Sequence, residues 1–313
     1  MSGPALRHTF DSALHIDEMD DALRLCDEII DASGPQSIVR ITSGVTDFAV
    51  DAFDELPGDS EPLRDACNRT ARLVASVISI QDGKLVDART GQLIRILMHG
   101  EHGAVYCFSV VPGQFIVGFT VAPTPKGAEL SRADSVHATD EAISGLVARL
   151  RRRMGLTDQN PGSYYRRSET RSDRSRPPAV TGRRDRPEFQ LIDAHVDPAD
   201  LHLAALIAPG DELVVDQLAH PQLSRFFGLI SVDARRKFYA EYARDLPKIA
   251  GQLGRLVRTS VGGSLLRLVL DVEQGAVYWY RLGAGRFLMG VTLDQEQVEA
   301  ADNKMSSLAL QIG

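Results

Sequence analysis

The chain alternates between stretches with helical spacing of apolar residues and short apolar runs bounded by glycine, proline or polar turns. In the first half, apolar positions three and four residues apart predict helices over residues 20–32, 61–80 and 134–151. Apolar runs between turn residues predict strands over residues 37–42, 47–53, 93–98, 104–111 and 115–121. The predicted order is α-β-β-α-β-β-β-α, which indicates an α+β domain with a mixed or antiparallel sheet and helices packed on it.

Part of this pattern occurs twice. Residues 91–121 and 263–293 align without a gap, and 12 of the 31 positions are identical. Unrelated segments would match at roughly two positions, so the similarity indicates a true internal repeat. The shared positions include a mid-strand arginine (Arg95 and Arg267) and a turn glutamate (Glu101 and Glu273).

The second half follows the same order from its first strand onward. We expect strands over 203–207 and 212–217, a long helix over 233–259 perturbed by Pro247, the three repeat strands, and a final helix from Asp302. The second copy lacks a clear first helix, because residues 189–200 are few and contain Pro198.

A basic segment separates the two copies. Residues 151–187 contain eleven arginines and four acidic residues, which gives this segment a charge of +7. Because the net charge of the whole chain is −7, the remaining residues carry −14. Four prolines and few apolar residues leave this segment little surface to bury, which predicts disorder. We therefore expect a first domain at 1–153, a disordered Arg- and Pro-rich linker at 154–187 and a second domain at 188–313.

The element order and the glycine turns of the meander RILMHGEHGAVYCFSVVPGQFIVGFTV resemble the roadblock/LC7 family, whose bacterial members are MglB-like. The resemblance covers about 110 to 130 residues of each half and rests on hydrophobic pattern and turns. Longin, profilin-like and PAS-like domains share much of this outline. The resemblance implies two tandem roadblock-like domains that pair through a sheet edge and the second helix, with a small Ras-like GTPase as the usual partner.

The chemical motifs of common enzymes are missing from the sequence. No GxxxxGK[ST], HExxH, CxxC or GxSxG occurs, the eight histidines are scattered, and the acidic pairs lie at predicted helix starts and loops. We therefore expect a non-enzymatic protein without cofactor or metal. Cys26, Cys67 and Cys107 are expected to be reduced core residues. No long apolar run or signal sequence is evident, so we expect a cytoplasmic protein.

The candidate interaction residues are all arginines. Arg95 and Arg267 are expected to form an exposed ladder with neighbouring carboxylates or to contact a partner. If the protein acts on a GTPase, the candidate contacts lie on the second helices. They are Arg64, Arg72, Arg235, Arg236 and Arg258.

Two further hypotheses stay open. With Tyr164 and Tyr165, the arginine-rich linker could bind nucleic acid, or it could touch an anionic membrane; otherwise it is a solvated tether. Alternatively, the domains could be small-molecule sensors with a PAS- or profilin-like pocket. The favoured partner is the chain itself, as an intramolecular pseudo-dimer or a homodimer, possibly together with a small GTPase.

Overall fold

The computed structural model is a mixed α/β protein that divides into two compact units. It describes residues 4–10, 20–30, 34–121, 129–166, 170–283 and 285–313. The first unit comprises Met1–Gln81, Ile94–Gln159 and Gln252–Leu266, and the second comprises Asp82–Leu93, Asn160–Gly251 and Arg267–Gly313. Each unit therefore includes a short segment of the other repeat.

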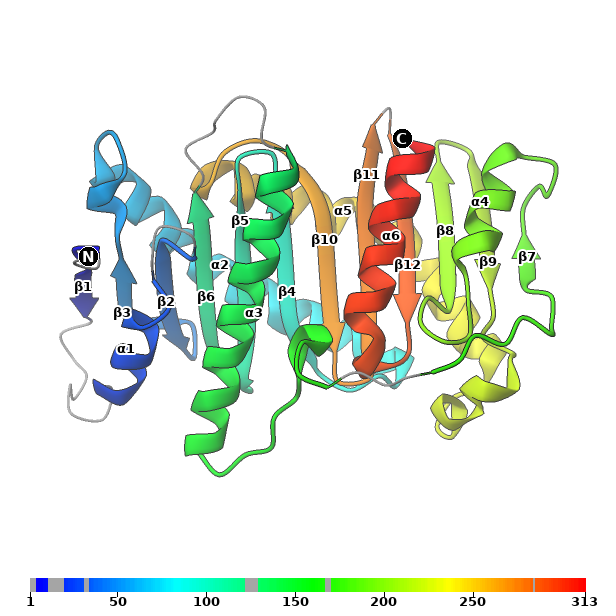
Figure 1. Cartoon of the computed structure of the whole chain (residues 1–313), viewed down its shortest axis with the longest axis horizontal. Coiled ribbons are helices and arrows are strands. Elements are labelled where there is room, and N and C mark those ends of the chain that lie inside the picture. The colour runs from blue at the N-terminus through cyan, green and yellow to red at the C-terminus, as the bar shows by residue number, and fades with distance from the viewer. Residues whose placement is uncertain (1–3, 11–19, 31–33, 122–128, 167–169, 284) are drawn as a thin grey trace. The chain divides into compact units, whose positions relative to one another are not determined.

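Among the described residues, six strands and three helices lie wholly or mainly in the first unit (Figure 1). The strands follow the order β1-β3-β2-β6-β5-β4, and the pairings described between them are antiparallel. Its elements are β1 (Arg7–Phe10), α1 (Asp20–Asp27), β2 (Ser37–Thr42), β3 (Val45–Asp51), α2 (Ser60–Leu85), β4 (Leu93–Gly100), β5 (Gly103–Val111), β6 (Gln114–Val121) and α3 (Glu129–Arg153).

The second unit repeats this plan with the order β10-β11-β12-β8-β9-β7. Its elements are β7 (Ala179–Thr181), α4 (Pro187–His195), β8 (Leu203–Ala208), β9 (Asp211–Asp216), α5 (Val232–Ser260), β10 (Leu265–Val272), β11 (Gly275–Gly283), β12 (Arg286–Thr292) and α6 (Val298–Ile312). Short 3-10 turns occur at Phe53–Glu55, Val86–Ala88, Pro161–Ser163, Pro221–Phe227 and Gln295–Gln297.

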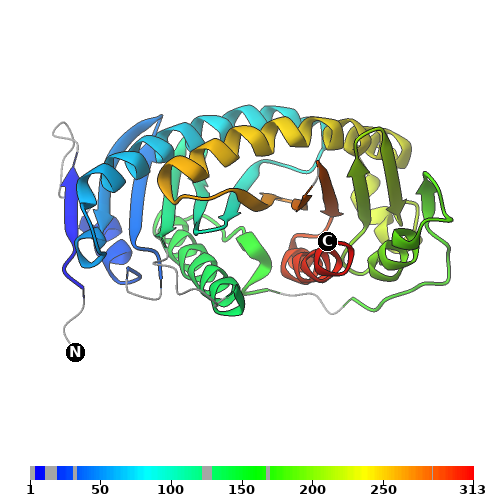
Figure 2. The same ribbon diagram turned by 90° about the horizontal axis from the view of Figure 1, so that it is seen from above.

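Each unit places its sheet between helices on both faces (Figure 2). In the first unit, α1 and α3 cover one face and α2 the other; in the second unit, α4 and α6 cover one face and α5 the other. The apolar strands are buried on both sides, which explains why they read as near-continuous apolar runs. Phe115 and Phe287, at equivalent positions after a glycine turn, are both 5% exposed.

Closing helices α3 and α6 approach their sheets at equivalent glycines. A Cβ added to Gly118 would lie 2.4 Å from Cδ1 of Ile143, and one added to Gly290 would lie 2.4 Å from Sδ of Met305. Only a residue without a side chain leaves room for the helix there. This explains why both repeats have glycine in the middle of an otherwise bulky strand.

The structure differs from the predicted elements at the sheet edges. Strands β1 and β7, which the sequence pattern does not predict, pair with β3 and β9 as outer strands of the two units. The prediction that the second copy lacks a first helix is wrong: α4 begins with a proline at its first turn and ends before Pro198. Nine residues suffice because α4 packs on α6.

The basic segment has more structure than predicted. Asn160 and Ser163 are buried in the second unit, where Gly162 N donates to Asp271 Oδ2 at 2.7 Å and Glu299 N donates to Ser163 Oγ at 2.9 Å. These polar anchors replace the apolar contacts whose scarcity predicted disorder. Residues 167–169 lie outside the described part.

No helix in the described part of the chain combines the length and the apolar composition needed to cross a membrane.

Candidate interaction surface

Arg64 and Arg236 hold equivalent positions and make equivalent ion pairs inside their own units. Arg64 donates from Nε to Asp51 Oδ2 at 2.7 Å and from Nη2 to Asp51 Oδ1 at 2.8 Å. Arg236 donates to Asp216 in the same fork, at 2.9 Å from each nitrogen. The hydrogen bonds to these aspartates raise the pKa of both arginines. Both side chains thus join the second helix of a repeat to its second strand.

Arg95 and Arg267 do not form the exposed ladder expected from the sequence. Each pairs with an aspartate on the closing helix: Arg95 Nη1 with Asp140 on α3, and Arg267 Nη2 with Asp302 on α6. The Arg95 side chain is only 2% exposed, and that of Arg267 is 22% exposed. The mid-strand position faces the closing helix rather than solvent, so a partner cannot reach Arg95.

Arg235 is also internal. The residue is 1% exposed, and its guanidinium donates to Ala88 O at 2.8 and 3.1 Å and lies 5.1 Å from the Phe227 ring centroid. Burial lowers its pKa, because the charged form loses hydration. The residue therefore fixes the segment after α2 within the second unit.

Arg72 and Arg258 remain exposed and form no ion pair within the described residues. Arg72 lies on an outward face of α2 that also carries Leu73 and Ile80, which are 48% and 59% exposed. Half-buried Val77 completes a stripe with helical spacing of four and three residues. We call Arg72, Leu73, Val77 and Ile80 the α2 face. Of the predicted contacts, Arg72 on this face and Arg258 on α5 are the exposed ones.

The helical spacing of apolar residues over 61–80 would place Leu73 on the buried side of its helix. In the structure the buried side of α2 is narrower and consists of small and medium residues, including Ala71, Val74, Ala75 and Ile78. Leu73 lies just beyond it. Apolar residues that widen a helical stripe past its core-facing part are the signal that could have revealed this surface.

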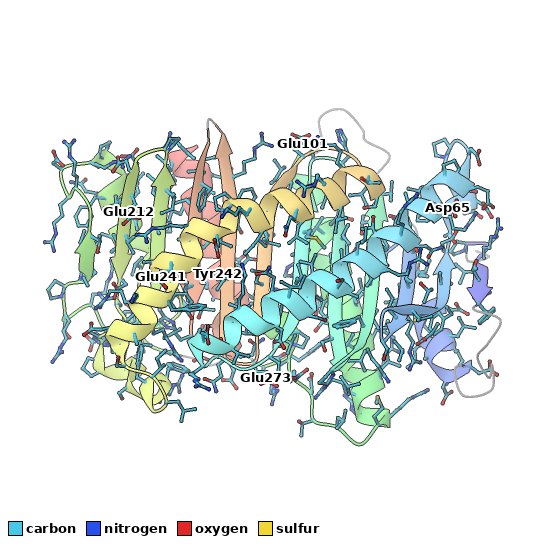
Figure 3. The ribbon with its side chains drawn as sticks, turned by 180° about the vertical axis from the view of Figure 1, so that it is seen from behind. Asp65, Glu101, Glu212, Glu241, Tyr242 and Glu273 are labelled. Atoms are coloured by element: carbon cyan, nitrogen blue, oxygen red, sulfur yellow. The ribbon has the colours of Figure 1, made fainter. Side chains whose placement is uncertain are left out.

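The turn glutamates have a structural role that is repeated in both units. In the first unit, Glu101 N donates to Ser264 O at 3.0 Å and Glu101 Oε2 accepts from Ser264 N at 2.9 Å. In the second unit, Glu273 N donates to Gln92 O at 3.0 Å and Glu273 Oε2 accepts from Gln92 N at 3.2 Å. Figure 3 shows both glutamates at strand turns. Each turn therefore binds the segment that precedes the third strand of the other repeat.

The glycine before each bound segment leaves room for the glutamate. Gly263 has φ +74° and a Cβ added there would lie 2.7 Å from Glu101 Cβ; Gly91 has φ +83° and the same distance to Glu273 Cβ. Both the left-handed backbone and the close approach favour glycine. Retention of Gly91/Gly263 and Glu101/Glu273 in the repeat thus has one common cause.

Several arginines of the basic segment are held by the second unit. Arg183 pairs with Asp185 at 2.7 Å, Arg186 with Asp211 at 2.5 Å, and Arg174 donates to Val196 O at 3.0 Å. The exposed arginines for which the described part of the segment shows no ion pair include Arg152, Arg171, Arg176 and Arg184. Binding of nucleic acid or membrane through this segment remains a hypothesis.

The metal-ligating residue types that the sequence offers are dispersed within the described residues, and the three thiols are buried. No group of three or more His, Cys, Asp or Glu residues there is placed to hold a metal ion. Cys26, Cys67 and Cys107 are buried and unbridged, and burial raises the pKa of each thiol, to about 12 for Cys26. They are protonated at neutral pH and poor nucleophiles.

No protein-family model matches the chain, and no curated protein sequence matches it significantly.

Proposed function

We propose that this chain is a non-enzymatic regulator or scaffold whose two roadblock-like repeats pair internally and bind a protein partner through the α2 face. The observation that carries the proposal is the α2 face itself, where two large apolar side chains are exposed beside an arginine that forms no ion pair with any described residue. Arginine is enriched in the energetic centres of protein interfaces, and burial of exposed aliphatic surface against a partner stabilises a complex.

Internal pairing of the repeats is supported by the reciprocal hydrogen bonds of Glu101 and Glu273. Each unit obtains part of its structure from the other repeat, at positions that the internal repeat retains. Such exchange favours one chain acting as a pseudo-dimer over two independent domains.

A small Ras-like GTPase is the partner class that the roadblock resemblance favours. Purified Ras-like GTPases from the host organism, loaded with GDP or a non-hydrolysable GTP analogue, are titrated with the full chain. Leu73→Asp and Ile80→Asp are each expected to weaken binding about tenfold or more, because a charge replaces an apolar contact. Leu310→Asp is the matched control, since Leu310 is an 84% exposed leucine on α6.

Equal loss of binding in Leu310→Asp would show that the effect is not specific to the α2 face. If none of the GTPases binds the full chain in either nucleotide state, this partner class is excluded. Thermal unfolding of each variant confirms that the substitution at an exposed position leaves the fold intact.

A further inference from the structure

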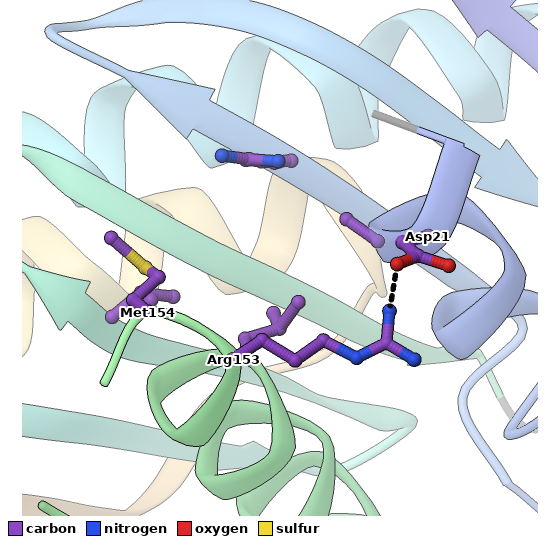
Figure 4. Close-up of a pocket in the computed structure, with 7 residues that line it drawn as sticks. Asp21, Arg153 and Met154 are labelled. Atoms are coloured by element: carbon purple, nitrogen blue, oxygen red, sulfur yellow. Dashed lines mark ion pairs between the residues drawn. The ribbon is translucent and has the colours of Figure 1, made fainter. Parts of the chain in front are cut away.

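The first unit contains a cavity of about 220 Å³ between α1, β2, β5 and the end of α3 (Figure 4). Its apolar wall includes Val110, Leu150 and Met154, and its charged lining consists of Asp21, Arg40 and Arg153. Pockets for drug-sized ligands are typically about 300–1,000 Å³, so this cavity suits a smaller molecule.

The guanidinium of Arg40 has N–H donors that can bind a ligand. Its Nε contacts Asp47 Oδ2 at 3.2 Å, and Asp47 also accepts from Thr42 Oγ1 at 2.6 Å. Within the described residues no acceptor engages the two terminal nitrogens of Arg40, whose side chain is 22% exposed. A guanidinium binds a carboxylate through two parallel hydrogen bonds, and a terminal pair of nitrogens suffices for this geometry.

Arg153 can supply a second contact. Its Nη1 lies 2.8 Å from Asp21 Oδ2, but the two side chains are 40% and 71% exposed. An ion pair this exposed contributes little stability, so Arg153 can turn toward a bound anion at small cost. Figure 4 shows this pair beside Met154 at the end of α3.

The positive charge at the position of Arg40 occurs in the first repeat and not in the second. Asp51 and Asp216 are equivalent, and they pair in register with Ser37 on β2 and Leu203 on β8. Three residues further along, Arg40 therefore corresponds to Leu206, which is fully buried. The fold does not need an arginine here, since the second repeat is built with leucine.

We infer that this cavity binds a small organic carboxylate with a short apolar tail. Arg40 and Arg153 hold the carboxylate, and Val110, Leu150 and Met154 contact the tail. The inference is independent of partner binding, because the cavity and the α2 face lie on different elements of the first unit.

The test compares hexanoate with hexanamide, which has the same tail and no charge. Both are titrated into the full chain by calorimetry and by ligand-observed NMR. Hexanoate is expected to bind saturably and hexanamide about tenfold or more weaker, as for loss of hydrogen bonds to a charged group. Equal binding of the two, or no saturable binding of hexanoate, overturns the inference.

Substitutions place the site. Arg40→Leu installs the residue of the second repeat and is expected to weaken hexanoate binding about tenfold or more. Arg255→Leu removes the same charge from an exposed position of the first unit outside the α2 face, and it should leave hexanoate binding unchanged. Equal losses in the two variants would mean that net charge, not the cavity, attracts the anion.

A second variant protects the test against misfolding of Arg40→Leu. Leu150→Trp fills the cavity from its apolar side without a change of charge, and it should abolish hexanoate binding. Retained affinity in Leu150→Trp overturns the site. Displacement of hexanoate by an equal concentration of inorganic phosphate overturns the assignment to carboxylates with a tail.

Discussion

His202, just before β8, is a buried neutral histidine that links folding to pH. It is 1% exposed, and its Nδ1 accepts a hydrogen bond from Leu293 N at 2.8 Å. Burial lowers its pKa from 6.5 to about 3. The folded protein therefore resists protonation at a site that the unfolded chain protonates readily.

The sign follows from the lowered pKa. Above about pH 6.5 His202 is neutral in both the folded and the unfolded state, and it leaves stability unaffected. As the pH falls from there toward 3, His202 gains a proton in the unfolded state only. Stability is then lost by about 1.4 kcal/mol per pH unit. His202→Asn keeps an acceptor for Leu293 N but cannot titrate in this range. We expect its free energy of unfolding, measured with urea between pH 7 and 4, to fall less steeply than that of the unmodified protein.

His137→Asn is the control, because it removes an exposed histidine instead. Parallel pH profiles for the unmodified protein and His202→Asn would show that His202 does not carry this effect.

Helix and strand are fitted to each other most tightly where α6 crosses Gly290. Because a Cβ there would lie 2.4 Å from Met305 Sδ, Gly290→Ala should displace α6 or its methionine and destabilise the fold by about 1–3 kcal/mol. Met305→Ala alone should cost about 2–5 kcal/mol, since Met305 is fully buried.

In the double variant the new methyl group occupies space that the methionine vacated. Its loss of stability should therefore be smaller than the sum of the two single losses, by about 0.5–3 kcal/mol in urea unfolding. Strict additivity would show that the helix does not rest on this glycine. Gly83→Ala on α2, with open space around the added methyl, is the control for replacing a glycine.

The sequence pattern predicts most accurately the helices and strands that pack in the core. Strand 37–42 is predicted to the residue, because the turn at Ser43-Gly44 has positive φ at both positions and ends the apolar run sharply. Strands β1 and β7 are missed because they have only four and three residues and lie at the outer edge, which is too short for an apolar pattern to show. The burial of Arg95 is missed because its partner Asp140 lies 45 residues away, beyond any local periodicity.

At the scale of the whole molecule, the two compact units do not end at the boundaries that the sequence suggests. Division at 153 and 188 removes Gln252–Leu266 from the first unit and Asp82–Leu93 from the second. No local sequence pattern predicts this exchange. The exchanged segments are the ends of helices and the starts of strands, and their apolar pattern is the same whichever unit they pack against. The repeat identifies the turn glutamates, but it does not identify the backbone groups that they bind.

Separately expressed halves, residues 1–153 and 188–313, test the exchange. Each half retains its turn glutamate but lacks the backbone N–H and C=O that the glutamate binds in the full chain. A mixture should therefore form a one-to-one complex in analytical ultracentrifugation, or each half should self-associate in the same manner. In Glu101→Ala the association should weaken about tenfold, since the partly buried N–H of Ser264 loses a charged acceptor. Asp65→Ala, at an exposed carboxylate on α2, should leave it unchanged. Two stable monomers that ignore each other would show that the repeats fold and act independently, and with that the internal pairing proposed for this chain would fall.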